Sequence, residues 1–139
     1  MNYFTVKDRQ VKDVIVLDIR GQVKGCGGRA VLHDAIFQKL EQGHRQFILN
    51  LAGVSSIDSS CLGELVASYL YLKNNGGKMT FIRLTQRVRE LLEVTNLIST
   101  FAIYKNEVDA LDSFLHNTLD LAKQSQSPST EKLKSFGLG

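Results

Sequence analysis

Short apolar runs along the chain predict five β-strands. The first two runs are divided only by the polar pair Lys12 and Asp13, a spacing typical of a β-hairpin. The third run is apolar from Phe47 to Leu51 except at Asn50, as in a strand that is buried on both faces. The predicted strands are residues 4–10, 14–21, 46–51, 78–84 and 100–104.

The segments that follow the second, third, fourth and fifth predicted strands carry apolar residues three and four positions apart, the period of an amphipathic α-helix. In the second of these helices we expect Leu65, Val66 and Tyr69 to be buried against a sheet. The same helical phase leaves three polar residues in solvent, namely Glu64, Ser68 and Lys73. The apolar positions that predict four helices are Leu32, Ala35, Ile36 and Leu40; Leu62, Leu65, Val66, Tyr69 and Leu70; Val88, Leu91 and Leu92; and Leu111, Phe114, Leu115, Leu119 and Ala122.

The elements therefore follow one another in the order β-β-α-β-α-β-α-β-α. Strands that alternate with helices indicate an α/β domain with a mixed, mainly parallel sheet on which the helices pack, while the first hairpin is antiparallel. We assign residues 1–122 to this single domain. Residues 123–139 lack a hydrophobic period and contain the only proline, Pro128, so we expect them to be a flexible C-terminal tail.

Composition and charge exclude several classes of protein. Hydrophobic residues make up 43% of the 139 residues, enough for one core, and the net charge of +3 comes without a basic stripe, which argues against a nucleic-acid partner. No apolar run is long enough to cross a bilayer, and the first residues lack the apolar core of an export signal, so we expect a cytoplasmic protein without membrane insertion. Two cysteines and three scattered histidines form neither a disulfide framework nor a metal-site spacing, and no metal or other cofactor is expected.

A cluster of hydroxyl groups precedes the second predicted helix. Asp58, Ser59 and Ser60 lie between a buried strand and the apolar face that begins at Leu62. One interpretation is structural, because Asp and Ser side chains cap the free N–H groups of a helix start and contribute about 1 kcal/mol. The other is functional, because the turn after a parallel strand lies at the sheet edge where α/β folds place their sites, and a helix start also favours a phosphate group. The residues alone leave both interpretations open.

The stretch IDSSCLGELV, residues 57–66, resembles the Asp-Ser-Ser/Thr-Gly-Leu-Gly signature of STAS-domain proteins, the anti-sigma factor antagonist family. A second stretch, NNGGKMTFIRLTQRVRELLEVTNL at residues 74–97, is similar to the family's Gly-Gly pair, strand and following helix. The resemblance extends over residues 4–120 and includes the order of the elements. The residues that match the motif are Asp58, Ser59, Ser60, Cys61, Leu62 and Gly63.

The resemblance implies a regulator that acts by partner switching. Such an antagonist binds an anti-sigma factor, which is also a serine kinase, and thereby frees the sigma factor. Phosphorylation of the serine after the motif aspartate, which is Ser59 here, releases the antagonist, and a serine phosphatase resets it. The other residues expected at the partner surface are Asp58, Ser60, Cys61, Leu62, Gly63 and Lys24.

Two departures from the family pattern bear on the partner. Where the family has Gly-Glu-Leu/Ile-Asp at the end of its second strand, this chain has Gly-Gln-Val-Lys, so that Lys24 replaces an acid close to the phosphorylated serine. A lysine there is expected to attract a phosphate group and to repel a basic kinase surface. Cys61 replaces the first motif glycine and is expected to add bulk where a partner backbone approaches.

Two other functions stay open at this point. A STAS-like subunit docked on a larger assembly, such as a lipid-transporting ABC complex or a stressosome-like scaffold, would carry a serine that is never phosphorylated. A small-molecule binding module is suggested only by the glycine-rich stretch at residues 25–29, which we expect to be a flexible loop because it lacks the full spacing of a phosphate-binding loop. We do not expect an enzyme, since Ser59 has no histidine at a recognisable spacing to serve as its base.

Overall fold

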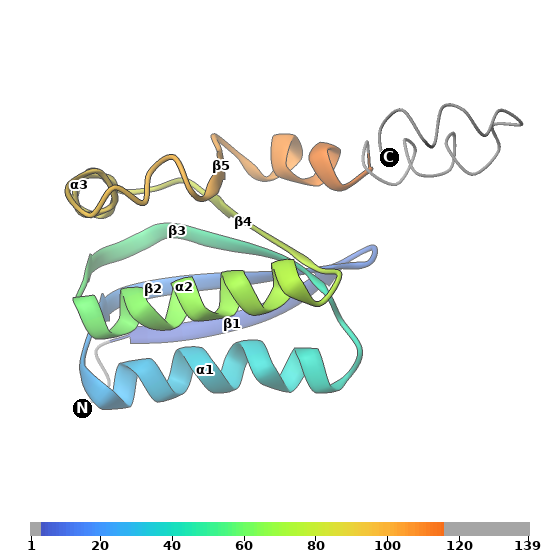
Figure 1. Cartoon of the computed structure of the whole chain (residues 1–139), viewed down its shortest axis with the longest axis horizontal. Helices are drawn as coiled ribbons and strands as arrows, with labels where there is room; N and C mark the ends of the chain where they lie inside the picture. Colours follow the sequence, from blue (N-terminus) through green and yellow to red (C-terminus); the bar gives the residue numbers. More distant parts are fainter. Residues whose placement is uncertain (1–3, 116–139) are drawn as a thin grey trace, which may run out of the picture.

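The first two apolar runs form an antiparallel hairpin, as the sequence predicts. β1 (Phe4–Val11) pairs with β2 (Val14–Val23) along its full length. Lys12 makes the tight turn between them with a φ of 57°. The computed structural model describes residues 4–115 of the chain, and Figure 1 shows how the elements of this part are arranged.

Three further strands extend the sheet in chain order. β3 (Gln46–Ile57), β4 (Lys78–Ile82) and β5 (Ala102–Tyr104) each pair in parallel with the strand before them. The order across the sheet is therefore β1-β2-β3-β4-β5. The mixed, mainly parallel sheet predicted from the sequence is confirmed.

Helices connect the parallel strands. They are α1 (Gly25–Glu41), α2 (Ser59–Asn74) and α3 (Gln86–Val94). Residues 107–115 are helical after β5, which completes the predicted order of elements. The rest of the predicted last helix and the predicted C-terminal tail lie outside the described residues. Within residues 4–115 no helix is long and apolar enough to span a membrane.

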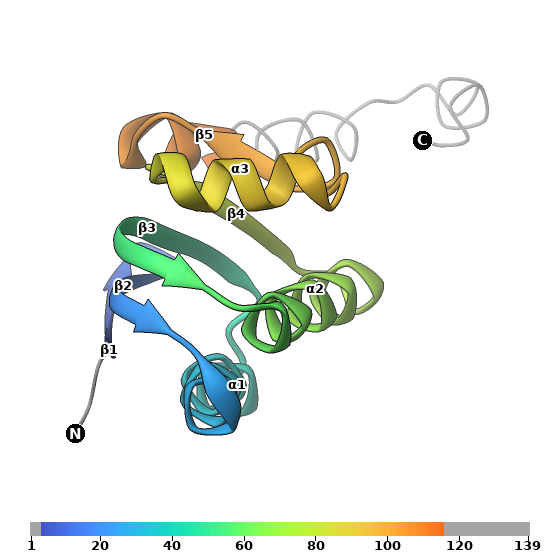
Figure 2. The ribbon, with the colours of Figure 1, turned by 90° about the vertical axis from the view of Figure 1, so that its left-hand side faces the viewer.

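The central strands of the sheet are buried on both faces. Ile15 and Leu17 of β2 point into the main core with residues of α1, α2 and α3, whereas Val14 and Val16 point to the opposite side. Figure 2 shows α1 and α2 side by side, and these two helices also contact each other. The smaller second core lies between the sheet and residues 107–115. It consists of Val14, Val16, Ile48, Ile82, Ala110 and Phe114.

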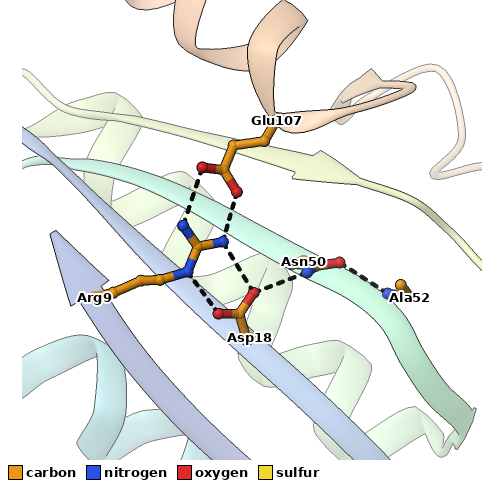
Figure 3. Close-up of polar contacts among 5 residues, drawn as sticks. All are labelled: Arg9, Asp18, Asn50, Ala52 and Glu107. Atoms are coloured by element: carbon orange, nitrogen blue, oxygen red, sulfur yellow. Dashed lines mark hydrogen bonds and ion pairs between the residues drawn. The ribbon is translucent and has the colours of Figure 1, made fainter. Parts of the chain in front are cut away.

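A charged network ties the segment 107–115 to the hairpin (Figure 3). Arg9 of β1 donates to Asp18 of β2 at 2.8 Å and to Glu107 at 3.0 Å, and Asn50 of β3 donates to Asp18 at 2.8 Å. The Arg9 guanidinium lowers the pKa of the Asp18 and Glu107 carboxyl groups. Because the Arg9 side chain is 41% exposed, solvent weakens both ion pairs, and we assign the network an orienting role.

The glycine-rich stretch is the first turn of α1, so the prediction of a flexible loop at residues 25–29 is wrong. Gly25 turns the chain out of β2 with a φ of 74°, which glycine adopts at little cost. Gly28 is buried, and a Cβ at that position would lie 3.4 Å from the sulfur of Cys61. Packing of α1 against the sheet and α2 therefore outweighs the low helix propensity of glycine.

β3 is longer than the predicted strand, because it continues past Leu51 to Ile57. The added residues pair with the end of β2, with Val54 opposite Gly21 and Ile57 opposite Val23. Of the added residues 52–57 only Val54 is buried, which allows polar residues such as Ser55 in this part of the strand.

The predicted faces of α2 are only partly right. Leu65 is buried, Val66 and Tyr69 are partly buried against the core, and Lys73 is exposed, as expected. Leu70, in contrast, is 46% exposed, and the expectation that Glu64 and Ser68 lie in solvent is wrong, because both are buried. The cause is that α2 packs on α1 as well as on the sheet, so that it has a second buried side.

Thr80 of β4 offers a direct test of the second core. The residue is fully buried, and its hydroxyl has no hydrogen-bond partner within the described chain. An unsatisfied buried hydroxyl costs about 1–3 kcal/mol, so Thr80→Val should raise the free energy of unfolding in urea by about 1 kcal/mol. Thr85→Val is the matched control and should lower it, because the Thr85 hydroxyl bonds Val54 and caps α3. A stability loss in Thr80→Val as large as in Thr85→Val would contradict this assignment.

Candidate functional site

Two helices begin side by side, at the carboxyl ends of two neighbouring strands. β2 and β3 are parallel neighbours whose last residues, Val23 and Ile57, lie opposite each other. Each strand is followed by one residue and then by a helix, so Lys24 stands at the N-cap of α1 and Asp58 at the N-cap of α2. The strand pairing therefore brings the two helix starts together.

Asp58 joins these two helix starts through one carboxylate. Its Oδ1 accepts the N–H of Cys61 at 2.9 Å, which caps α2, and its Oδ2 accepts the N–H of Gly25 at 2.8 Å, at the start of α1. The capping role expected of Asp58 is confirmed. The N–H of Cys61, followed by that of Gly25, lowers the pKa of the Asp58 carboxyl group. The carboxylate thus contributes stability at neutral pH, which is lost as the pH falls through its lowered pKa.

The motif residues divide into an exposed and a buried set. Ser59 and Ser60 are exposed in the first turn of α2, and Gly63 is exposed one turn later. Cys61 and Leu62 are buried, so their side chains belong to the core of the isolated chain. Neither serine hydroxyl has a hydrogen-bond partner within residues 4–115.

Lys24 lies beside this turn. The residues on either side of it both bond Asp58, because the carbonyl of Val23 accepts the Asp58 N–H at 3.1 Å and Gly25 donates to its carboxylate. The Lys24 side chain is exposed and forms no ion pair or hydrogen bond with the described part of the chain. Lys24 also gives α1 no side-chain cap. The pair of helix starts that carries the serines therefore also carries an exposed cation that has no ion pair among the described residues.

Cys61 points inward, between α1 and α2. Its sulfur lies 3.7 Å from the carbonyl oxygen of Gly25, and burial, with a smaller contribution from Asp58, raises the pKa of the thiol to about 12. The expectation that Cys61 adds bulk at the partner surface is therefore wrong. The physical reason is that Gly28 of α1 leaves room for the extra sulfur inside the fold.

A polar cluster between α1 and α2 was not anticipated from the sequence. Glu64 is 5% exposed. Its carboxylate accepts hydrogen bonds from Arg29 at 3.4 Å and from Ser68 at 3.3 Å, and it contacts the His33 ring at 2.9 Å. The His33 ring also stacks on Phe37 at a centroid distance of 4.3 Å. The sequence signal for this cluster is a pair of i, i+4 spacings. Arg29 and His33 share one face of α1, and Glu64 and Ser68 share one face of α2. The cluster fixes how α1 and α2 face each other just below the exposed serines.

Residues 6–110 match the sequence profile of the STAS domain. The chain belongs to the STAS domain family. The anti-sigma F factor antagonist of Paenibacillus polymyxa is 32% identical to this STAS domain over 78 residues, which cover 56% of this chain and 65% of that protein. The chain thus spans less than two thirds of that relative's length.

Solved structures share the fold of this STAS domain. An anti-sigma factor antagonist from Mycobacterium paratuberculosis superposes with a TM-score of 0.70 at 24% identity, over 79% of this chain and 92% of the other. The Bacillus cell fate determinant SpoIIAA in its phosphorylated form superposes with a TM-score of 0.63 at 17% identity, over 79% of this chain and 99% of the other. At these identities the likeness establishes the fold, and with it the α/β class predicted from the sequence.

The two cysteines of this STAS domain should differ in reactivity. Cys26 is exposed in the first turn of α1, whereas Cys61 is buried and its raised pKa leaves almost no thiolate at pH 8. Iodoacetamide at pH 8 should therefore alkylate one thiol in the folded chain, located at Cys26 by peptide mapping, and two in denaturant. A folded Cys26→Ser variant should stay unlabelled. Labelling of Cys61 at the rate of Cys26 would contradict its buried placement.

Proposed function

We propose that this STAS domain is an anti-sigma factor antagonist that works by partner switching. It binds an anti-sigma factor that is also a serine kinase, and phosphorylation of Ser59 by that kinase ends the binding until a serine phosphatase removes the phosphate. The observation that carries the proposal is the exposed Ser59 hydroxyl, held at the start of α2 beside the Asp58 bridge. The likeness to an anti-sigma F factor antagonist supports the choice of partner.

A phosphate on Ser59 suits the local structure. It would sit at the positive end of α2, where helix N–H groups and the helix dipole favour negative charge. The helix would stay folded, while the phosphate adds a charge of about −2 to the surface around Ser59, Ser60 and Gly63. The phosphate therefore acts on the partner by repulsion and bulk at the surface and leaves the fold unchanged.

Asp58 is poorly placed to act as a base for Ser59. Both of its oxygens already accept backbone N–H groups, and its lowered pKa makes it a weak proton acceptor. The groups that catalyse phosphate transfer would thus come from the kinase. In this proposal the chain is the acceptor of the phosphate and a binding protein, not an enzyme.

Lys24 tunes the proposed reaction. Lys24 is exposed and has no ion pair within residues 4–115, its backbone neighbours both bond Asp58, and its ammonium would attract a phosphate attached to Ser59. The same charge would repel a basic surface on the kinase before transfer. We infer a slow transfer step and a phosphorylated form that is more stable than in relatives with an acid at this position.

A non-phosphorylated subunit of a larger assembly is the second candidate. Lys24 favours it, because a cation in place of the family's acid weakens the case for a conventional kinase partner. Cys61 no longer favours it, because the side chain is buried and leaves the surface unaltered. Phosphate analysis of the protein purified from its own host separates the two candidates.

The test of the proposal maps the phosphate after incubation with the cognate anti-sigma kinase and ATP. Mass spectrometry should find phosphate on Ser59 in the wild type and in Ser60→Ala, and none in Ser59→Ala, which should still bind the kinase. Ser59→Asp should keep the circular dichroism spectrum and bind more weakly, because it places a negative charge at the partner surface. In the same assay Lys24→Asp should be phosphorylated faster than the wild type.

Two outcomes count against the proposal. Phosphate on Ser60, or no phosphate on the wild type with a kinase that is active on another substrate, would favour the subunit candidate. An unchanged rate in Lys24→Asp would show that this lysine takes no part in the reaction, without affecting the assignment of Ser59.

A further inference from the structure

β5 is the last strand of the sheet in the described part of the chain, two strands away from β3, which leads into the serine site. Within residues 4–115 it pairs only with β4, through Thr80 to Ile82, and β4 pairs on its other side with β3. Within the described chain no backbone hydrogen bond satisfies the outer side of Ala102–Tyr104. An exposed strand edge is a template on which an extended peptide can add a further strand.

A cleft of about 370 Å³ runs along this edge. Its apolar lining comes from Ile98 and Phe101 of the connecting segment and from Ile103 of β5. Figure 2 shows α3 lying in front of β5, and Arg89 of α3 reaches the same cleft. Lys105, directly after β5, lies on the strand side. The cleft therefore combines an apolar lining, a strand edge and two cations.

These two cations have no counter-ion among the described residues. Arg89 and Lys105 are exposed, form no ion pair within residues 4–115, and no acidic residue lines the cleft. Arg9 and Lys39, in contrast, are paired with Asp18 and Asp8. The charge at the cleft is thus available for a ligand that brings carboxylates.

We propose that the β5 edge binds an extended, acidic peptide segment of a partner protein by strand addition. The backbone of the peptide would bond the outer edge of β5, and the side chains on its face toward α3 would place apolar groups against Ile98 and Ile103 and carboxylates against Arg89 and Lys105. A second copy of this chain fits less well, because pairing of two β5 edges would bring like charges together. This inference is independent of the proposed role of Ser59.

The probe is a fluorescein-labelled peptide of nine residues, Thr-Val-Thr-Glu-Thr-Val-Thr-Glu-Thr, which carries its Val and Glu side chains on one face of a strand, with both ends blocked. At low salt the full chain should bind it saturably, and the amides of Ala102–Tyr104 should gain protection from hydrogen exchange. Arg89→Glu with Lys105→Glu should weaken binding by about tenfold or more, since two ion pairs become repulsive. The matched control is Lys73→Glu with Arg87→Glu, two exposed cations outside the cleft, and it should bind as the wild type does.

Two peptide variants complete the test. The same peptide with alternate N-methylated amides should lose binding, because it cannot donate to the strand edge, and a version with Lys in place of Glu should not bind. The proposal is overturned if the peptide with Glu shows no saturable binding, if the N-methylated peptide binds equally well, or if the control variant weakens binding as much as the cleft variant. Melting curves of both double variants verify that they are folded.

Discussion

The carboxylate of Asp58 is the interaction on which the geometry of the site depends. Two helices start from the carboxyl ends of neighbouring parallel strands, and each has free N–H groups there. Asp58 satisfies one of these groups in each helix, at 2.8 and 2.9 Å, while its own N–H bonds the end of β2. A cap of this kind contributes about 1 kcal/mol to one helix, and here the same side chain also fixes the position of the other.

The rest of the site follows from this bridge. With the helix starts tied together, α1 and α2 pack closely enough to bury Cys61 and to enclose Glu64 with Arg29 and His33. Ser59 is left at the surface in the first turn of a helix. In the proposed function this placement suits a switch that works by surface charge, because the fold need not change when the charge does.

Much of the fold could be predicted because apolar spacing reports how each element faces the sheet. The hairpin, the order of elements and the buried positions Leu32, Ile36 and Leu65 follow from periods of two and of 3.6 residues. The start of α1 could not be predicted, because the propensity of Gly25 to Gly28 favours a loop and only tertiary packing makes it a helix. Glu64 and Ser68 were missed because the spacing along one helix carries no information about a second helix beside it. The serine site is a prediction from its motif, whereas the bridge from Asp58 to Gly25 joins residues 33 positions apart, which no local pattern reveals.

Amide hydrogen exchange of Gly25 and Cys61, followed by NMR, tests the bridge most directly. In Asp58→Ala both amides should exchange faster than in the wild type, because both lose their acceptor. In Asp58→Asn only one of the two should lose protection, since the amide side chain offers a single acceptor oxygen. Unchanged exchange at both amides in folded Asp58→Ala would contradict the claim that this carboxylate holds the two helix starts together.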